Sequence, residues 1–332
     1  MHTTMTTLTQ RVALTQGVRF HADRRCEPRG MRAPPLAARC SGKPVNADST
    51  KRAEASPLEL SSASSRRTAL GAAAAVLSFP FLAERSQASA EVKTVMVVGA
   101  TGATGQFIYK ELLGRPGVRV IAGVRSLEKA EKMGITGAVK VDVTSSPATI
   151  ASALVGVDAV VCATGFIPGN PFKFSQAAHA IDNVGTVNLV DAAVSAGVTK
   201  FVLISSILTN GRVIGQEKSP GFVITNAFGG VLDEKLVAEQ HLRASGMDYT
   251  IVRPGGLKGE PAKTPLVVSG EDTLFSGEIS RELVGAAAAE AVFAPGAKNK
   301  VVELMESGSC VDPGKPGCPT SAGSNDRSTW FA

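Results

Sequence analysis

The sequence predicts a single α/β domain, built on a doubly wound parallel sheet, with a disordered N-terminal leader and a disordered C-terminal tail. A short β-branched run at residues 92–98 passes directly into a glycine-rich turn and then into a segment of helical periodicity. Runs of strand length and segments of helical period then alternate as far as residue 305. This alternation indicates parallel βαβ units with right-handed crossovers, and hence a Rossmann-type fold over residues 91–306.

The turn after the first strand has the spacing of a phosphate-binding loop, Gly99-Ala100-Thr101-Gly102-Ala103-Thr104-Gly105. The first glycine permits a tight turn, the second lets the backbone approach a pyrophosphate, and the third allows helix and strand to pack closely. A helix predicted over 106–113 would direct its first N–H groups at the anion. A tight turn without a ligand is the alternative. The predicted cofactor contacts in this loop are Gly99, Thr101, Gly102, Ala103, Thr104 and Gly105.

The remaining elements follow in order along the chain. Strands are predicted at 118–124, 139–143, 157–163, 200–205, 249–253 and 300–305. Helices are predicted at 127–133, 147–154, 174–196, 232–244 and 278–293. Residues 307–332 are rich in Gly, Pro and Ser, and this composition predicts a disordered tail.

Residues at the ends of the second, third and fourth strands indicate which dinucleotide would bind. Arg125 follows the second strand, where an acidic residue would favour NAD and an arginine accommodates the 2′-phosphate of NADP. A solvated surface arginine is the alternative. The third strand ends beside the expected adenine and the fourth along the ribose and pyrophosphate path, which adds Asp142, Val143, Ala163, Thr164 and Gly165 to the cofactor contacts. The sequence therefore predicts NADP as the cofactor.

Five segments carry a resemblance to a known family. They are residues 99–105, 162–166, 182–190, 200–207 and 249–257. In sequence and order these segments resemble the atypical short-chain dehydrogenase/reductases of the NmrA-like group, and especially the plastid NAD(P)-binding proteins of that group. The resemblance spans nearly all of the domain. It implies NADP(H) in the cleft and a substrate pocket built by residues around 207–228 and 255–277.

Apolar side chains around the implied pocket indicate a hydrophobic ligand. Phe222, Phe228 and Leu257 lie in the two pocket segments, and Phe166 and Phe172 follow the fourth strand. Such side chains suit a flat ring system such as a quinone, a pigment or a flavin-like ring. The alternative is that they only cover the edge of the sheet.

The catalytic residues that the resemblance implies are only partly present. Typical members use a serine and a Tyr-x-x-x-Lys motif, in which the tyrosine is the general acid or base. Ser205, Ser206 and Lys235 match the serine and the lysine, but Val231 stands where the tyrosine is expected. Lys235 is also a predicted cofactor contact, at the nicotinamide ribose, with a solvated surface lysine as the alternative. Whether the protein is an enzyme therefore stays open. It is either an NADP-dependent oxidoreductase acting on a hydrophobic or conjugated small molecule, or a non-catalytic NADP-binding factor for redox sensing or assembly at the thylakoid.

The first ninety residues have the composition of a targeting leader. Residues 1–65 are typical of a plastid transit peptide. The paired arginines, uncharged run and small-residue cleavage site of residues 66–90 are typical of a twin-arginine export signal. This order predicts the thylakoid lumen. If residues 66–90 are only a linker within the transit peptide, the stroma is the alternative.

The charge of the domain and its His and Cys residues limit the partners. Residues 1–90 hold 13 Lys and Arg against 6 Asp and Glu, whereas residues 91–332 hold 22 against 23, so nucleic acid is not an expected partner. The expected partner is a small-molecule substrate, and peripheral association with the thylakoid is a further hypothesis. His179 and His241 lack the spacing of metal ligands, so no metal is expected. Cys310 and Cys318 either form a disulfide in an oxidising compartment or remain free thiols.

Overall fold

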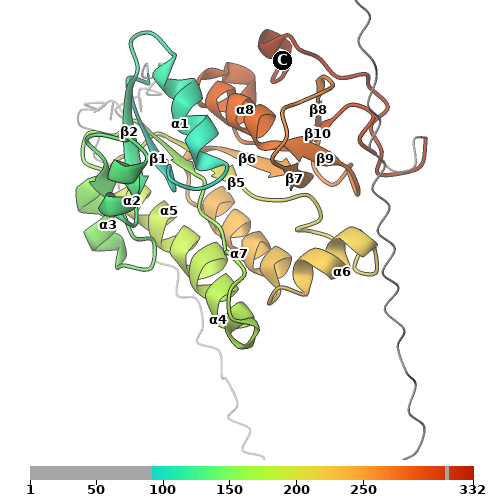
Figure 1. Ribbon diagram of the computed structural model, residues 1–332, viewed down its shortest axis with the longest axis horizontal. Coiled ribbons are helices and arrows are strands. Elements are labelled where there is room, and N and C mark those ends of the chain that lie inside the picture. The colour runs from blue at the N-terminus through green and yellow to red at the C-terminus, as the bar shows by residue number, and fades with distance from the viewer. Residues whose placement is uncertain (1–91, 311–313) are drawn as a thin grey trace, which may run out of the picture. The chain divides into compact units, whose positions relative to one another are not determined.

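The computed structural model describes residues 92–310 and 314–332, which form an eight-stranded sheet with helices on both faces (Figure 1). The predictions for residues 1–65 and 66–90 lie outside the described residues. The strand order is β3-β2-β1-β4-β5-β6-β10-β8. The parallel strands are β1 (Thr94–Val98), β2 (Arg119–Val124), β3 (Val139–Lys140), β4 (Ala159–Cys162), β5 (Lys200–Ile204), β6 (Asp248–Pro254) and β10 (Lys300–Glu306). The edge strand β8 (Leu266–Ser269) is antiparallel to β10. The predicted doubly wound α/β class is confirmed.

Strand β1 shows why the central strands are almost continuously apolar. Val95 and Val97 point into one core cluster, and Met96 and Val98 point into the other. Both faces of the sheet are covered, so every position of such a strand is buried. The first cluster contains residues of α1 (Gly105–Leu113), α2 (Leu127–Lys132) and α8 (Arg281–Phe293), and the second those of α3 (Pro147–Ala153), α5 (Thr186–Ser195) and α7 (Val231–Ala244).

The long helix predicted over 174–196 is present but is not a uniform α-helix. It consists of α4 (Phe174–Ala178), a π-helical turn at His179–Gly185 and then α5. A short 3₁₀ turn at Pro171–Lys173 precedes it. Each π-helical hydrogen bond spans one residue more than an α-helical bond, which alters where the following side chains point.

Several short elements were not predicted. They are α6 (Pro220–Asn226), the pair β7 (Gly256–Lys258) and β9 (Glu278–Ser280), and the edge strand β8. Each strand is only three or four residues long, so no periodicity can be detected in it. The helix predicted from residue 278 instead begins at Arg281, because Ser280 caps it by accepting the Leu283 N–H.

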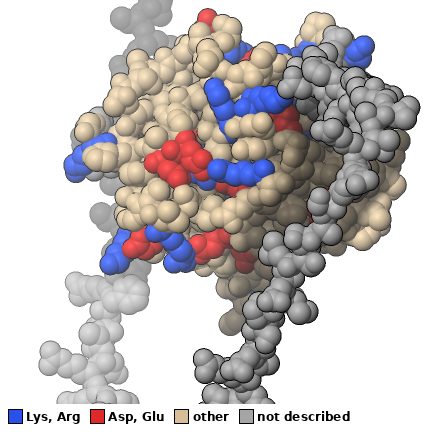
Figure 2. Space-filling model, turned by 180° about the vertical axis from the view of Figure 1, so that it is seen from behind, with Lys and Arg blue, Asp and Glu red and all other residues tan. Residues whose placement is uncertain are grey.

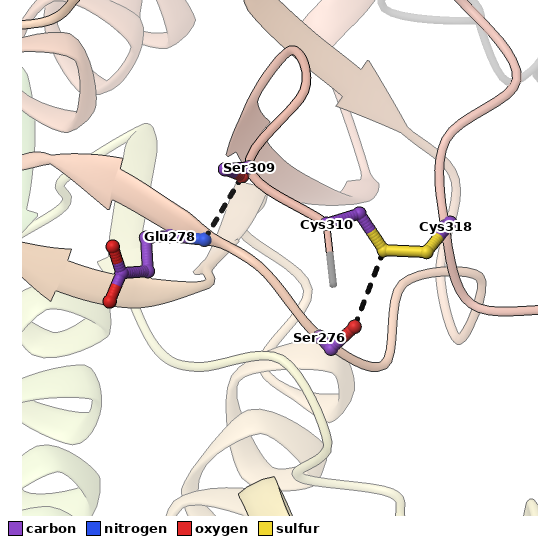
Figure 3. The surroundings of a disulfide bond; sticks show 5 residues. All are labelled: Ser276, Glu278, Ser309, Cys310 and Cys318. Carbon is purple, nitrogen blue, oxygen red and sulfur yellow. Dashed lines mark hydrogen bonds between the residues drawn. A yellow bond between two sulfur atoms is a disulfide. The ribbon is translucent and has the colours of Figure 1, made fainter. Parts of the chain in front are cut away.

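The prediction of a disordered tail over residues 307–332 is wrong for its described part. Trp330 and Phe331 are buried in the core beside α1 and α8, and Ser324 forms a bridge with Leu266 of β8. A Cys310–Cys318 disulfide closes the start of this segment against the loop before β9 (Figure 3). Composition failed as a guide here because two aromatic anchors and a covalent bond suffice to hold a segment without periodicity.

The surface charges are mixed, and the lengths of the helices bear on whether one could span a membrane. On the face seen in Figure 2, Lys and Arg side chains lie next to Asp and Glu side chains, between larger uncharged areas. In the part of the chain that the structure describes, no helix is both long enough and apolar enough to span a membrane.

Candidate functional site

The glycine-rich loop connects β1 to α1 at the carboxyl edge of the sheet. Gly99 has φ +88°, and a Cβ there would lie 2.9 Å from the carbonyl oxygen of Ala163, so the turn excludes a side chain. A Cβ on Gly105 would lie 2.1 Å from the carbonyl oxygen of Gly99. The first and third glycines therefore allow β1, β4 and α1 to approach as closely as they do.

The N-terminus of α1 has the features of an anion site. Its N-cap residue, Thr104, makes no side-chain capping hydrogen bond, and the first turn holds no acidic residue. Thr101, Gly102 and Thr104 are half-buried and Ala103 is exposed, so the loop is accessible. The Gln106 and Phe107 N–H groups donate to the Gly102 and Thr104 carbonyl oxygens, so it is mainly the positive end of the helix dipole that favours a phosphate here. The shape of the loop and the helix end fit a dinucleotide.

A second cation accompanies Arg125 beside this loop. Arg125 is exposed after β2, and the Lys129 ammonium on α2 donates to the Thr101 carbonyl oxygen at 2.8 Å. Sequence reasoning missed Lys129, because a lysine in a short surface helix gives no signal of a contact with a distant loop. The two cations border the region where a 2′-phosphate is expected.

Asp142 lies close enough to Arg125 to be influenced by its charge. Its Oδ1 accepts the Thr144 N–H at 3.0 Å and the Thr144 hydroxyl at 2.8 Å. Burial raises the pKa of Asp142, but the Thr144 hydrogen bonds and the Arg125 charge outweigh it, and the pKa lies below its ordinary value. Val143 is buried, and its carbonyl oxygen accepts the Asn188 amide at 3.2 Å. The segment after β3 is therefore held by several hydrogen bonds.

Lys235 lies at the carboxyl end of β4, where the Ala163-Thr164-Gly165 segment begins. Its Nζ is 2.8 Å from Oδ1 of Asp182, and a Cβ built on Gly165 would lie 4.0 Å from that Nζ. Burial alone would lower the pKa of Lys235, but the Asp182 carboxylate raises it above the ordinary lysine value. The structure thus brings the predicted lysine to the predicted cofactor segment as a cation.

Cys162 lies beneath the same segment and has a structural environment. Its Sγ is 3.2 Å from the Thr164 hydroxyl, and the side chain is fully buried. Burial raises the pKa of the thiol, so the thiolate needed for nucleophilic chemistry is disfavoured.

The two predicted serines differ in their surroundings. Ser206 is half-buried. Ser205 is 6% exposed, and its hydroxyl donates to Oε1 of Glu239 at 2.5 Å. Glu239 is itself held by Arg253, with Nη2 to Oε2 at 2.6 Å. Ser205 therefore donates its hydrogen bond to the buried Glu239–Arg253 ion pair, whereas Lys235 forms an ion pair with Asp182.

Arg253 is the centre of a buried network that sequence reasoning missed. Besides Glu239 it contacts Asp272 at 2.7 Å and Glu303 at 3.5 Å. Glu303 accepts the backbone N–H groups of residues 272, 273 and 274 at 2.7–3.0 Å. The network joins α7, β6 and β10 and fixes a loop of the implied substrate region. Single charged residues in strands gave no signal for it.

Aromatic rings gather beside the loop after β4. The Phe174 ring centroid lies 5.5 Å from that of Phe166 and 5.6 Å from that of Phe228. Phe172 is 98% exposed and Leu257 is 39% exposed. Phe222, in contrast, is buried in a separate core cluster under α6 and is not available to line a pocket. The implied pocket residues are thus only partly brought together.

The comparisons with known proteins define the class. A family model described as NAD(P)H-binding matches residues 99–295, so the chain belongs to this NAD(P)H-binding family. That result agrees with the glycine loop and with the resemblance to atypical short-chain dehydrogenase/reductases. Among residues 92–310 and 314–332, no cluster of three or more His, Cys, Asp or Glu side chains could hold a metal ion.

The chain is similar to chloroplastic proteins and to an oxidoreductase of known structure. A chloroplastic protein of Arabidopsis thaliana, At2g34460, is 47% identical over 234 residues, covering 67% of this chain and 80% of the relative. The chloroplastic protein TIC 62 of Pisum sativum is 36% identical over 210 residues, covering 56% of this chain and 38% of TIC 62. The oxidoreductase ylbE of Lactococcus lactis has a similar structure, with a TM-score of 0.56 and 26% identity over 65% of this chain and 92% of ylbE.

Proposed function

We propose that this protein is a plastid NADP(H)-dependent oxidoreductase acting on a hydrophobic or conjugated small molecule. The observation that carries the proposal is a pair of cations: Arg125, exposed directly after β2, and Lys129, which donates to the Thr101 carbonyl oxygen of the glycine loop. Two cations there favour a cofactor with a 2′-phosphate over one without it. The similarity to ylbE supports an oxidoreductase, and the chloroplastic relatives support a plastid location.

Different residues of the site would bind different parts of the cofactor. The glycine loop and the first turn of α1 would bind the pyrophosphate, and Arg125 with Lys129 would bind the 2′-phosphate. Asp142 and Val143 would border the adenine, and Lys235 would donate hydrogen bonds to the ribose at the nicotinamide end. The cofactor, when bound, supplies or accepts the hydride.

The apolar side chains beside the loop after β4 support the substrate class. Phe166, Phe174 and Phe228 form one ring cluster beside the β4 loop, and Phe172 is exposed next to it. A conjugated acceptor would stack on such rings. It could also take its proton from water, so that positioning beside the cofactor would matter more than a dedicated acid.

Binding measurements test the cofactor assignment. The full chain should bind NADPH more tightly than NADH in a fluorescence titration. Arg125→Gln and Lys129→Gln should each weaken NADPH binding about tenfold or more, because a charged hydrogen bond to phosphate is lost, and Arg125→Gln should leave NADH binding unchanged. Lys132→Gln is the matched control, since Lys132 lies on the same helix but pairs with Glu128. Equal affinity for both cofactors would refute the assignment.

A non-catalytic NADP-binding factor at the thylakoid is the second candidate. It is favoured by Val231 at the position of the absent tyrosine and by the engagement of Ser205 with Glu239. NADPH oxidation assayed with a series of quinones and conjugated acceptors distinguishes the two. Turnover with any acceptor supports the oxidoreductase, and tight NADPH binding without turnover supports the binding factor.

The compartment within the plastid is a separate proposal. We favour the thylakoid lumen, with peripheral membrane association, on the twin-arginine pattern of residues 66–90. Sequencing the mature N-terminus tests it. A start at Glu91 would support lumenal processing, and a start before Arg66 would assign the protein to the stroma.

A further inference from the structure

Asp182 is a fully buried carboxylate that no catalytic motif accounts for. Its side chain has 0% exposure, although it carries two strong hydrogen-bond acceptors. Its Oδ2 accepts the Phe166 N–H at 3.0 Å, and its Oδ1 lies 2.8 Å from the Lys235 ammonium. One carboxylate therefore joins three elements: the long helix, the loop after β4 and α7.

The π-helical turn provides the position from which Asp182 makes these contacts. Asp182 lies in the middle of the turn, and the adjacent Asn183 reaches Glu234 of α7 at 2.7 Å. Gly185 ends the turn, where a Cβ would lie 2.8 Å from Cγ2 of Val143 and 2.9 Å from the Ala180 carbonyl oxygen. A larger residue at 185 would push the turn away from Val143, which lies in the segment after β3. Turns of this kind often occur at functional sites.

Stability alone is a poor reason for this arrangement. Burying an ion pair costs desolvation energy that its mutual attraction often fails to offset, and apolar pairs of similar size are frequently as stable. Lys235 is also not sealed in, because its side chain keeps 16% exposure. A Cβ built on Gly165, which lies on the expected cofactor path, would be 4.0 Å from the Lys235 ammonium. The pair therefore faces the place where a ligand would lie.

We propose that Asp182 is a positioning residue, held by the π-helical turn, which fixes the Lys235 ammonium and the loop after β4 so that Lys235 serves as a permanent hydrogen-bond donor to the ribose hydroxyls of the cofactor. This inference rests on the proposed NADP(H) binding. It assigns Lys235 to binding and orientation. Proton donation to the substrate is then not its role.

The proposal has a consequence for pH dependence. The titratable groups that act most strongly on Lys235 are Asp182 from the π-helical turn, Cys162 from β4 and Glu239 from its own helix. Burial lowers the pKa of Lys235 and Asp182 raises it. Without the Asp182 charge, burial dominates, and Lys235 loses its proton at a lower pH. NADPH affinity should then fall as the pH rises.

The test compares Asp182→Asn with Glu234→Gln in the full chain. Asparagine keeps the size of the side chain and an acceptor for the Phe166 N–H but removes the charge. Glu234 bridges the same two helices through His179 and Asn183, whereas Lys235 pairs with Asp182. Between about pH 7 and pH 9.5, NADPH affinity of the wild type and Glu234→Gln should stay nearly constant. That of Asp182→Asn should fall about tenfold or more. Parallel profiles for all three would overturn the proposal.

A double variant guards against a purely structural effect of Asp182→Asn. Combined with Lys235→Met, it removes both charges, which costs less stability than leaving one charge buried. If Asp182 acts only through Lys235, the double variant binds NADPH as weakly as Lys235→Met at every pH. A further loss in the double variant would overturn the proposal.

A measurement on the ligand-free chain separates this proposal from the proposed function. The titration of Lys235 can be followed by NMR of labelled lysine side chains without any cofactor. If the pKa of Lys235 is lower in Asp182→Asn than in the wild type, the result supports the proposal that the Asp182 charge keeps Lys235 protonated. An unchanged pKa of Lys235 overturns it. Failure of the wild type to bind NADPH would overturn the proposed function and leave this titration result intact.

Discussion

Replacing Trp330 by alanine should remove a large part of the stability of the domain. The side chain is 6% exposed in the core beside α1 and α8, and its Nε1–H donates to the Ser324 carbonyl oxygen at 3.0 Å. Truncating a buried aromatic side chain costs about 3–5 kcal/mol, because packing is lost and a cavity remains. Domains are typically stable by only about 5–15 kcal/mol. Trp330→Phe, which keeps a ring but loses the hydrogen bond, should cost less.

Urea unfolding followed by circular dichroism measures these changes in the full chain. Phe172→Ala is the matched control, since Phe172 is 98% exposed and its truncation should change the free energy of unfolding by less than about 0.5 kcal/mol. Trp330 is the sole tryptophan, so its fluorescence reports directly on the C-terminal segment of the wild type. Its transition should coincide with that of the dichroism. An earlier fluorescence transition, or a loss below about 1 kcal/mol in Trp330→Ala, would refute the assignment of this segment to the core.

Three further outcomes are expected. Arg253→Met should lower the free energy of unfolding by about 3–5 kcal/mol in urea titrations, because it leaves buried carboxylates uncompensated; a loss within error of zero would contradict the network. Replacing Cys310 and Cys318 by serine opens a short loop and should cost about 2–3 kcal/mol, seen as an earlier transition of the tryptophan fluorescence. Unchanged transitions would mean that the disulfide does not hold the segment. Gly105→Ala, whose Cβ would lie 2.1 Å from a backbone oxygen, should abolish NADPH binding in a fluorescence titration, and wild-type affinity would rule out the packing role.

Local pattern was sufficient to predict most of the sheet. Strand β1 and the glycine loop were predicted because each leaves a signal within about ten consecutive residues. Lys235 was found through its place in a motif, and the structure brings it to the end of β4. The same reasoning failed for the C-terminal segment, where composition indicated disorder but Trp330 and Phe331 are buried.

The sequence by itself determined the α/β class, the edge of the sheet at which the glycine loop lies and the place of Arg125 directly after β2. These follow from burial on both faces of a strand and from the spacing of three glycines, which are properties of neighbouring residues. Tertiary structure decided the rest. The Asp182–Lys235 pair and the Arg253 network join side chains 14 to 53 positions apart, and the buried carboxylates become stable only when packing brings their partners to them. Contacts of that kind depend on how the elements meet in three dimensions, and no local pattern encodes them.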